Sequence, residues 1–103
     1  MKPQDAAHWL QQACGIRLAQ DPVVQSGNAV VPRQGSSVAA SATVVLPAKE
    51  IASALDSLRN NRSLHSRGQS DTRYSYESYP DVMPVKACEV DTALRVIYFS
   101  YLQ

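Results

Sequence analysis

The last stretch of the sequence, residues 87–101, constrains the fold more than any other, because it alternates with a period of two. Its even positions, beginning with Cys88, are largely apolar, whereas its odd positions are polar up to Arg95 and apolar from Ile97. β-Branched and aromatic residues in this pattern predict a strand with one buried face. The change at Ile97 indicates that both faces are covered at the end of the strand. The sequence therefore predicts that this strand is central in its sheet.

Two stretches have the spacing of amphipathic helices, residues 1–14 and residues 48–60. The first has Pro3 in its first turn and Gly15 directly after its end, where these residues favour a helix start and a helix stop. The second follows Pro47, which also suits a helix start. The predicted apolar faces consist of Ala6, Trp9, Leu10, Ala13 and Cys14 in the first helix, and of Ile51, Ala52, Leu55 and Leu58 in the second.

The remaining segments predict strands and connections. Residues 37–46 alternate and predict a strand, and residues 73–79 predict a shorter one that pairs antiparallel with residues 87–101. Residues 23–31 carry two Val pairs around Ser-Gly-Asn, which predicts a hairpin, with a loop as the competing interpretation. Residues 33–36 have the composition of a turn, and residues 62–72 that of a long polar loop.

This order of elements predicts a single α+β domain over residues 1–103, with an antiparallel sheet of about four strands and two helices packed on one face. A chain of this length has room for one core. No run of 18 apolar residues predicts a membrane span. Residues 1–13 lack the apolar segment of a signal peptide, but the numbering can also begin after a removed leader.

The charge is low for a cytosolic domain, since 18% of the residues are charged and the net charge is +1. Nucleic-acid binders normally carry a marked basic excess, so the sequence predicts no nucleic-acid partner. Lysine is scarce, with Lys2, Lys49 and Lys86 the only three. A charge-poor, lysine-poor composition also suits an extracytoplasmic protein.

The two cysteines, Cys14 and Cys88, are too few and too far apart for a zinc site, and no metal or other cofactor is expected. A disulfide between them closes a long loop and contributes roughly 4 kcal/mol on the chain-entropy model. It also implies an oxidising compartment. Two free buried thiols are the alternative. A cysteine–histidine nucleophile with His8 or His65 lacks a supporting motif, so the protein is not expected to be an enzyme.

Arginine and tyrosine concentrate in residues 62–79, and together they are typical of protein-binding hot spots. An ordinary polar loop beside an ordinary strand is the competing interpretation, and single-stranded nucleic acid is a weaker one. Glu89 and Asp91 share one face of the last strand, where they either share a proton or a metal, or form a solvated acidic edge. The residues predicted to bind a partner protein are Arg62, His65, Arg67, Arg73, Tyr74, Tyr76 and Tyr79.

Leu46-Pro47 leads from a strand into an amphipathic helix, a tyrosine-rich hairpin follows, and a disulfide can staple the ends. In this pattern the chain resembles small bacterial periplasmic immunity proteins and periplasmic inhibitors of lysozyme-type enzymes. The resemblance implies a periplasmic or secreted protein that neutralises a toxin or enzyme by occluding its active site. It supplies no site residues. The alternative is a structural or assembly subunit of an envelope or phage complex that pairs through residues 73–79 as a sheet edge.

Overall fold

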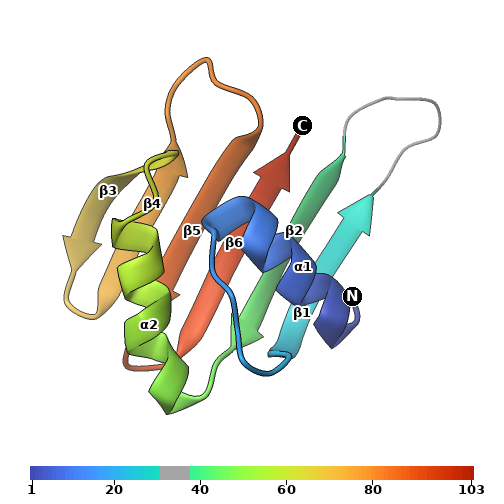
Figure 1. Cartoon of the computed structure of the whole chain (residues 1–103), viewed down its shortest axis with the longest axis vertical. Coiled ribbons are helices and arrows are strands. Elements are labelled where there is room, and N and C mark those ends of the chain that lie inside the picture. Colours follow the sequence, from blue (N-terminus) through green and yellow to red (C-terminus); the bar gives the residue numbers. More distant parts are fainter. Residues whose placement is uncertain (31–37) are drawn as a thin grey trace.

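The computed structural model describes residues 1–30 and 38–103 (Figure 1). Six strands form one antiparallel sheet in the order β1-β2-β6-β5-β4-β3. Both helices lie on the same face of this sheet (Figure 1). No helix in the described part of the chain is long and apolar enough to cross a membrane. The elements are α1 (Pro3–Cys14), β1 (Val23–Val30), β2 (Ala39–Val45), α2 (Ala48–Arg59), β3 (Leu64–Ser70), β4 (Arg73–Ser78), β5 (Val85–Asp91) and β6 (Val96–Leu102).

The predicted sheet of about four strands is wrong, because the sheet has six. The α+β class and the placement of two helices on one face are confirmed. Two local differences add strands, because residues 87–101 form two strands and residues 62–72 contain one; residues 23–30 form one strand instead of a hairpin, which removes one.

In residues 87–101 the apolar positions change from even to odd because the chain reverses direction at residues 92–95. β5 and β6 form a hairpin in which Val90 pairs with Ile97 and Asp91 pairs with Val96. Paired residues point to the same side of a sheet, so an even position on β5 shares a face with an odd position on β6. The turn places Arg95 at φ 57°, a left-handed conformation. The prediction of one strand covered on both faces was wrong, although β5 and β6 are the two central strands.

Residues 64–70 form the edge strand β3, although this stretch was predicted to be a polar loop. It pairs with β4 through a two-residue turn at Asp71 and Thr72, and Asp71 adopts φ 51°. Aspartate tolerates this conformation better than most residues. Beyond Leu64 the strand exposes nearly all its side chains, so no buried face imposes an apolar alternation that the sequence could reveal.

β1 runs straight through the segment predicted to turn. Gly27 lies in the middle of the strand, opposite Ala42 of β2. A Cβ atom added to Gly27 would lie 2.6 Å from the Cβ of Ala42, so the glycine permits a close approach of two strands and not a turn. The chain between the valine pairs therefore stays extended, and the predicted turn at residues 33–36 lies outside the described residues.

The helices and β2 confirm their predictions. Gly15 ends α1 with φ 71°, and its N–H donates to the carbonyl oxygen of Gln11 at 2.9 Å. Trp9 packs against Tyr101 with ring centroids 5.3 Å apart. In α2, Ala54 takes the buried position that the sequence suggested for Ala52, while the rest of the predicted stripe is buried.

The core lies between the helices and the face of the sheet that they cover. On β2 the covering helices meet Ala40, Ala42 and Val44, all nearly inaccessible. Small residues here let α1 approach the sheet closely. On the central strands the buried residues are Cys88, Val90, Ile97 and Phe99.

The disulfide between Cys14 and Cys88 is present, as predicted, with the two Cα atoms 6.2 Å apart. Cys14 is the last residue of α1, and Cys88 lies in the middle of β5. Both side chains are buried, so the bond anchors the end of the helix to the centre of the sheet. It closes a loop with a sequence separation of 74 residues.

Replacing both cysteines by alanine should lower the free energy of unfolding by roughly 4 kcal/mol, because the unfolded chain regains the freedom that the long covalent loop removes. Urea denaturation followed by Trp9 fluorescence measures the change. Wild-type protein unfolded in the presence of a reductant is the control and should lose a similar amount. An unchanged midpoint in the variant would contradict the assignment.

Candidate functional site

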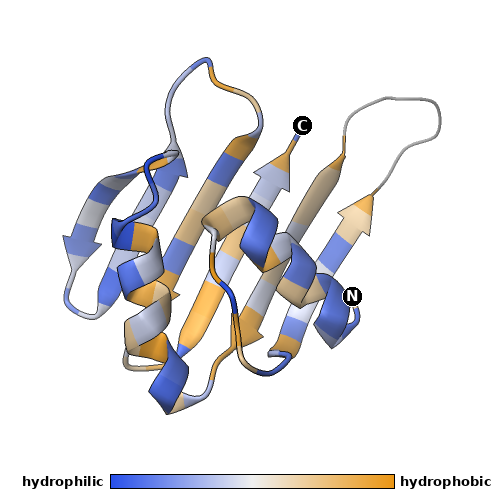
Figure 2. Ribbon diagram, viewed as in Figure 1, coloured by the Kyte–Doolittle hydropathy of each residue, from blue (hydrophilic) through white to orange (hydrophobic). Residues whose placement is uncertain are grey.

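The face of the sheet opposite the helices carries no element of the described chain, and we call it the uncovered face. On the four inner strands its side chains alternate with those that point towards the helices, and they are at least partly accessible. The register sets them in four rows across the strands. Figure 2 shows hydrophilic residues along most of β3 and β4, and hydrophobic ones along much of β2 and β6.

The two outer rows are apolar over the half of the sheet formed by β1, β2 and β6. One row joins Val30, Ala39 and Leu102, and continues to Val85 on β5. The other joins Val23, Val45 and Val96. Several of these side chains are about half exposed or more: Val23 is 65% exposed, Val30 53%, Val85 47% and Leu102 46%. Exposed apolar side chains aligned in rows are typical of an interaction surface.

Over β1, β2 and β6 the two inner rows are lined by small polar residues, with one large side chain, Tyr98, in their midst. Tyr98 is 44% exposed and stands between Thr43 on β2 and Glu89 on β5. A tyrosine offers a large apolar surface and a hydroxyl at little cost in conformational entropy. Tyr98 thus has the properties of an anchor for a partner that lies across the sheet.

The half of the face formed by β3, β4 and β5 carries the charges. Glu77 lies 3.5 Å from both His65 and Arg67, measured between its oxygens and their nearest nitrogens. Nε of Arg73 lies 3.4 Å from Oδ2 of Asp91. The charges of Arg67 and Arg73 are therefore partly neutralised by these carboxylates. No ion pair joins Glu89 to another residue of the described chain.

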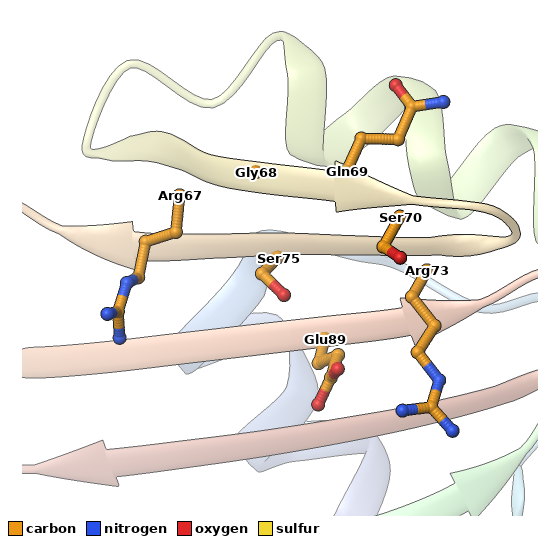
Figure 3. A pocket seen from close by; sticks show the side chains of 7 residues that line it. All are labelled: Arg67, Gly68, Gln69, Ser70, Arg73, Ser75 and Glu89. Atoms are coloured by element: carbon orange, nitrogen blue, oxygen red, sulfur yellow. The ribbon is translucent and has the colours of Figure 1, made fainter.

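A hollow of about 440 Å³ opens on this charged half. Figure 3 shows Glu89 between Arg67 and Arg73, with Ser75 beside it. The side chains of both arginines are about two-thirds exposed. The hollow thus offers two cations around one anion, which suits a partner surface that presents carboxylates with a cation between them.

Asp91 fixes the turns at the end of this face. Its Oδ1 accepts the backbone N–H groups of Ala93 and Leu94 at 3.0 Å each and the hydroxyl of Thr72 at 3.1 Å. These bonds, led by the one from the Leu94 N–H, hold the pKa of Asp91 below its usual value. Asp91 is thus a structural carboxylate that joins the β3–β4 and β5–β6 turns.

The structure separates the predicted partner-binding residues. His65, Arg67 and Arg73 lie on the uncovered face, and Tyr79, 48% exposed, stacks on His65 with ring centroids 4.9 Å apart. Arg62 is exposed in the turn before β3.

Two of the tyrosines belong to the other face. Tyr76 is 9% exposed and packs in the core, and Tyr74 packs against it from the same side of the sheet. The guanidinium carbon of Arg59 lies 5.6 Å from the centre of the Tyr74 ring. This split follows from the alternation of a strand, because neighbours in sequence point to opposite faces.

The sequence did not single out Tyr98, and Glu89 appeared only as part of an acidic pair. Both were assigned to one long strand in a phase that the β5–β6 hairpin reverses. The turn residues 92–95 were the available signal, because a hairpin there places Glu89 and Tyr98 opposite each other.

The cysteines carry no chemistry beyond the disulfide. Both sulfurs are bonded to each other and both residues are buried, so neither can act as a nucleophile with His8 or His65 while the bond is intact.

Comparisons with protein-family models, with curated proteins and with solved structures find no match to this chain. The chemistry of the uncovered face is therefore the basis for a functional interpretation.

Acid should destabilise the fold through Asp91. Its folded-state pKa lies below the unfolded value of about 3.9, so its contribution is complete above that pH and is lost as the pH falls through the folded pKa. Asp91→Asn should lower stability at neutral pH and flatten the decline below about pH 4. Thermal unfolding between pH 2 and pH 7 measures both effects. Asp81→Asn, which removes an exposed carboxylate from the connection between β4 and β5 (residues 79–84), is the control, and an identical decline in both variants would contradict the role of Asp91.

Proposed function

We propose that this chain is an extracytoplasmic protein-binding domain that acts as an immunity or inhibitor protein, with the uncovered face as its binding surface. One observation carries the proposal: a broad sheet face without a covering layer combines Tyr98, two exposed apolar rows and a hollow flanked by Arg67 and Arg73. Apolar anchors surrounded by charged residues are the composition of specific protein interfaces.

The arginines support binding to an acidic surface. In the free protein each faces a carboxylate, but an exposed pair of this kind contributes only about 0–1 kcal/mol. Exchanging such a partner for a carboxylate in a water-excluded interface therefore costs little, and a guanidinium can bind it through two parallel hydrogen bonds. Occlusion of an enzyme's acidic cleft by this half of the face is the mechanism that we propose.

The disulfide supports the extracytoplasmic location. Such bonds form and persist in oxidising compartments and are rare where thiols are kept reduced. The bond between Cys14 and Cys88 is buried in the core and joins the first helix to a central strand, so it belongs to the architecture.

The second candidate function is a structural or assembly subunit. The prediction that residues 73–79 form a sheet edge for pairing with another chain is wrong, because β4 lies between β3 and β5. In the part of the chain that the structure describes, β1 and β3 are the edge strands of the sheet, and the exposure of β1 is the observation that favours an assembly role.

The partner can be identified by photo-crosslinking. Replacing Tyr98 by p-benzoylphenylalanine and irradiating intact cells should join this chain to one protein, identified by mass spectrometry, whose enzymatic or toxic activity the purified domain then inhibits. The same probe at Gln12, exposed on α1, is the control for the helix side. Crosslinking from Gln12 but not from Tyr98, or a partner whose activity is unaffected, would contradict the proposal.

Arg67→Ala combined with Arg73→Ala should weaken binding of that partner by roughly 30-fold or more, because truncated hot-spot arginines typically cost about 2 kcal/mol or more. Isothermal titration calorimetry measures the dissociation constants. Arg17→Ala combined with Lys49→Ala removes the same charge from exposed positions outside the uncovered face and should leave binding unchanged. Equal losses in both double variants would indicate long-range attraction and not a contact at the hollow.

A further inference from the structure

The two edges of the sheet differ in charge. β3 carries His65 and Arg67. Both edge strands have a bulge, but charged side chains also discourage an edge strand from pairing with another chain. The other edge, β1, has eight residues and no charged side chain. The β1 edge is therefore the one on which a further strand can lie without burying a charge.

Most of β1 is open to solvent. All its residues except Val24 and Gly27 are exposed. Val23 and Val30, at its two ends, are among the most exposed apolar side chains described, at 65% and 53%. Its backbone pairs with β2 on one side, and β1 ends the strand order on the other. An added strand would thus satisfy open backbone groups and cover two valines.

The bulge in β1 makes the strand symmetric about Gly27. Its register with β2 shifts between Val24 and Ser26, so Gln25 is the extra residue. As a result Val23 and Val30 both lie on the uncovered face, although seven positions apart they would otherwise point to opposite faces. Without the extra residue, three paired positions precede Gly27 and three follow it.

We propose that β1 pairs antiparallel with β1 of a second copy of this chain, about a two-fold axis at Gly27. Directly opposite residues of an antiparallel pair point to the same face. The symmetric register satisfies this rule at every position of β1 that pairs with β2, because Val23 faces Val30 of the second copy and Ser26 faces its Asn28, all on the uncovered face. On the covered face Val24 faces Ala29 of the second copy, and the two glycines meet at the axis.

The pairing joins the uncovered faces of both copies into one. The row through Leu102, Ala39 and Val30 continues into the row through Val23, Val45 and Val96 of the second copy. A hollow of about 430 Å³, lined by Val30, Tyr98 and Leu102, lies along the part of this joined row that one copy contributes. The dimer thus presents two long apolar bands that a single copy cannot form. The inference does not depend on the proposed immunity or inhibitor function.

The test is the oligomeric state of the whole chain without tags. Sedimentation equilibrium should give a concentration-dependent mass approaching twice the 11.3 kDa of one chain at about 100 μM. Ser26→Lys combined with Asn28→Lys places lysines opposite lysines across the axis and should give monomers. Ser26→Glu combined with Asn28→Glu should do the same, and an equimolar mixture of the two variants should recover the dimer, because each lysine then faces a glutamate.

Ser66→Lys combined with Ser70→Lys on β3 is the matched control, which should dimerise like the wild type. Circular dichroism and thermal unfolding confirm that each variant is folded. A wild-type monomer at about 1 mM overturns the inference, because even weak association is populated at that concentration. A dimer that survives the β1 lysines, or that is lost with the β3 lysines, overturns it equally, since a different surface then joins the copies.

Discussion

The whole sheet depends on the pairing of β6 with both of its neighbours. β6 bonds to β2 on one side and to β5 on the other, and it is the one link between the β1–β2 pair and the β3–β4–β5 meander. Helix α2 carries the chain from β2 to the far edge at β3, so the meander must return across the sheet before β6 can close it. Phe99 and Ile97 are fully buried on this strand, so core packing and sheet continuity rely on the same residues.

The position of the two helices decides which side chains of the sheet remain accessible to a partner. Two short helices cover one face only, so every strand presents alternate residues to a layer that is absent from the described chain. The uncovered face of an antiparallel sheet is typically polar, and over β1, β2 and β6 the inner rows follow this pattern with serine, threonine and asparagine. Tyr98 and the two apolar outer rows depart from this pattern, and their exposure is the feature that requires an explanation.

Elements with a buried face could be predicted from the sequence, and elements without one could not. α1, α2 and β2 each place apolar residues at regular spacing against the core, and their bounds were predicted within about two residues. β3 has one buried residue, Leu64, and therefore no pattern to detect. The alternation of β5 and β6 was recognised, but the turn between them was not. That one omission also concealed the opposition of Tyr98 and Glu89, so neither was among the residues predicted to bind a partner.

The disulfide has a mechanical consequence. Cys14 and Cys88 enclose α2 and β1 to β4 in a covalent ring, whereas β6 lies outside it. Tension applied to the two ends of the chain is carried across the ring by the sulfur–sulfur bond, so only residues 1–13 and 89–103 can be drawn out while the bond is intact. β6 is then the strand that yields, and its departure leaves a gap between β2 and β5 as wide as one strand. Under load the oxidised protein would thus keep residues 14–88 in one covalent ring, although the sheet without β6 is divided into the β1–β2 pair and the β3–β4–β5 meander.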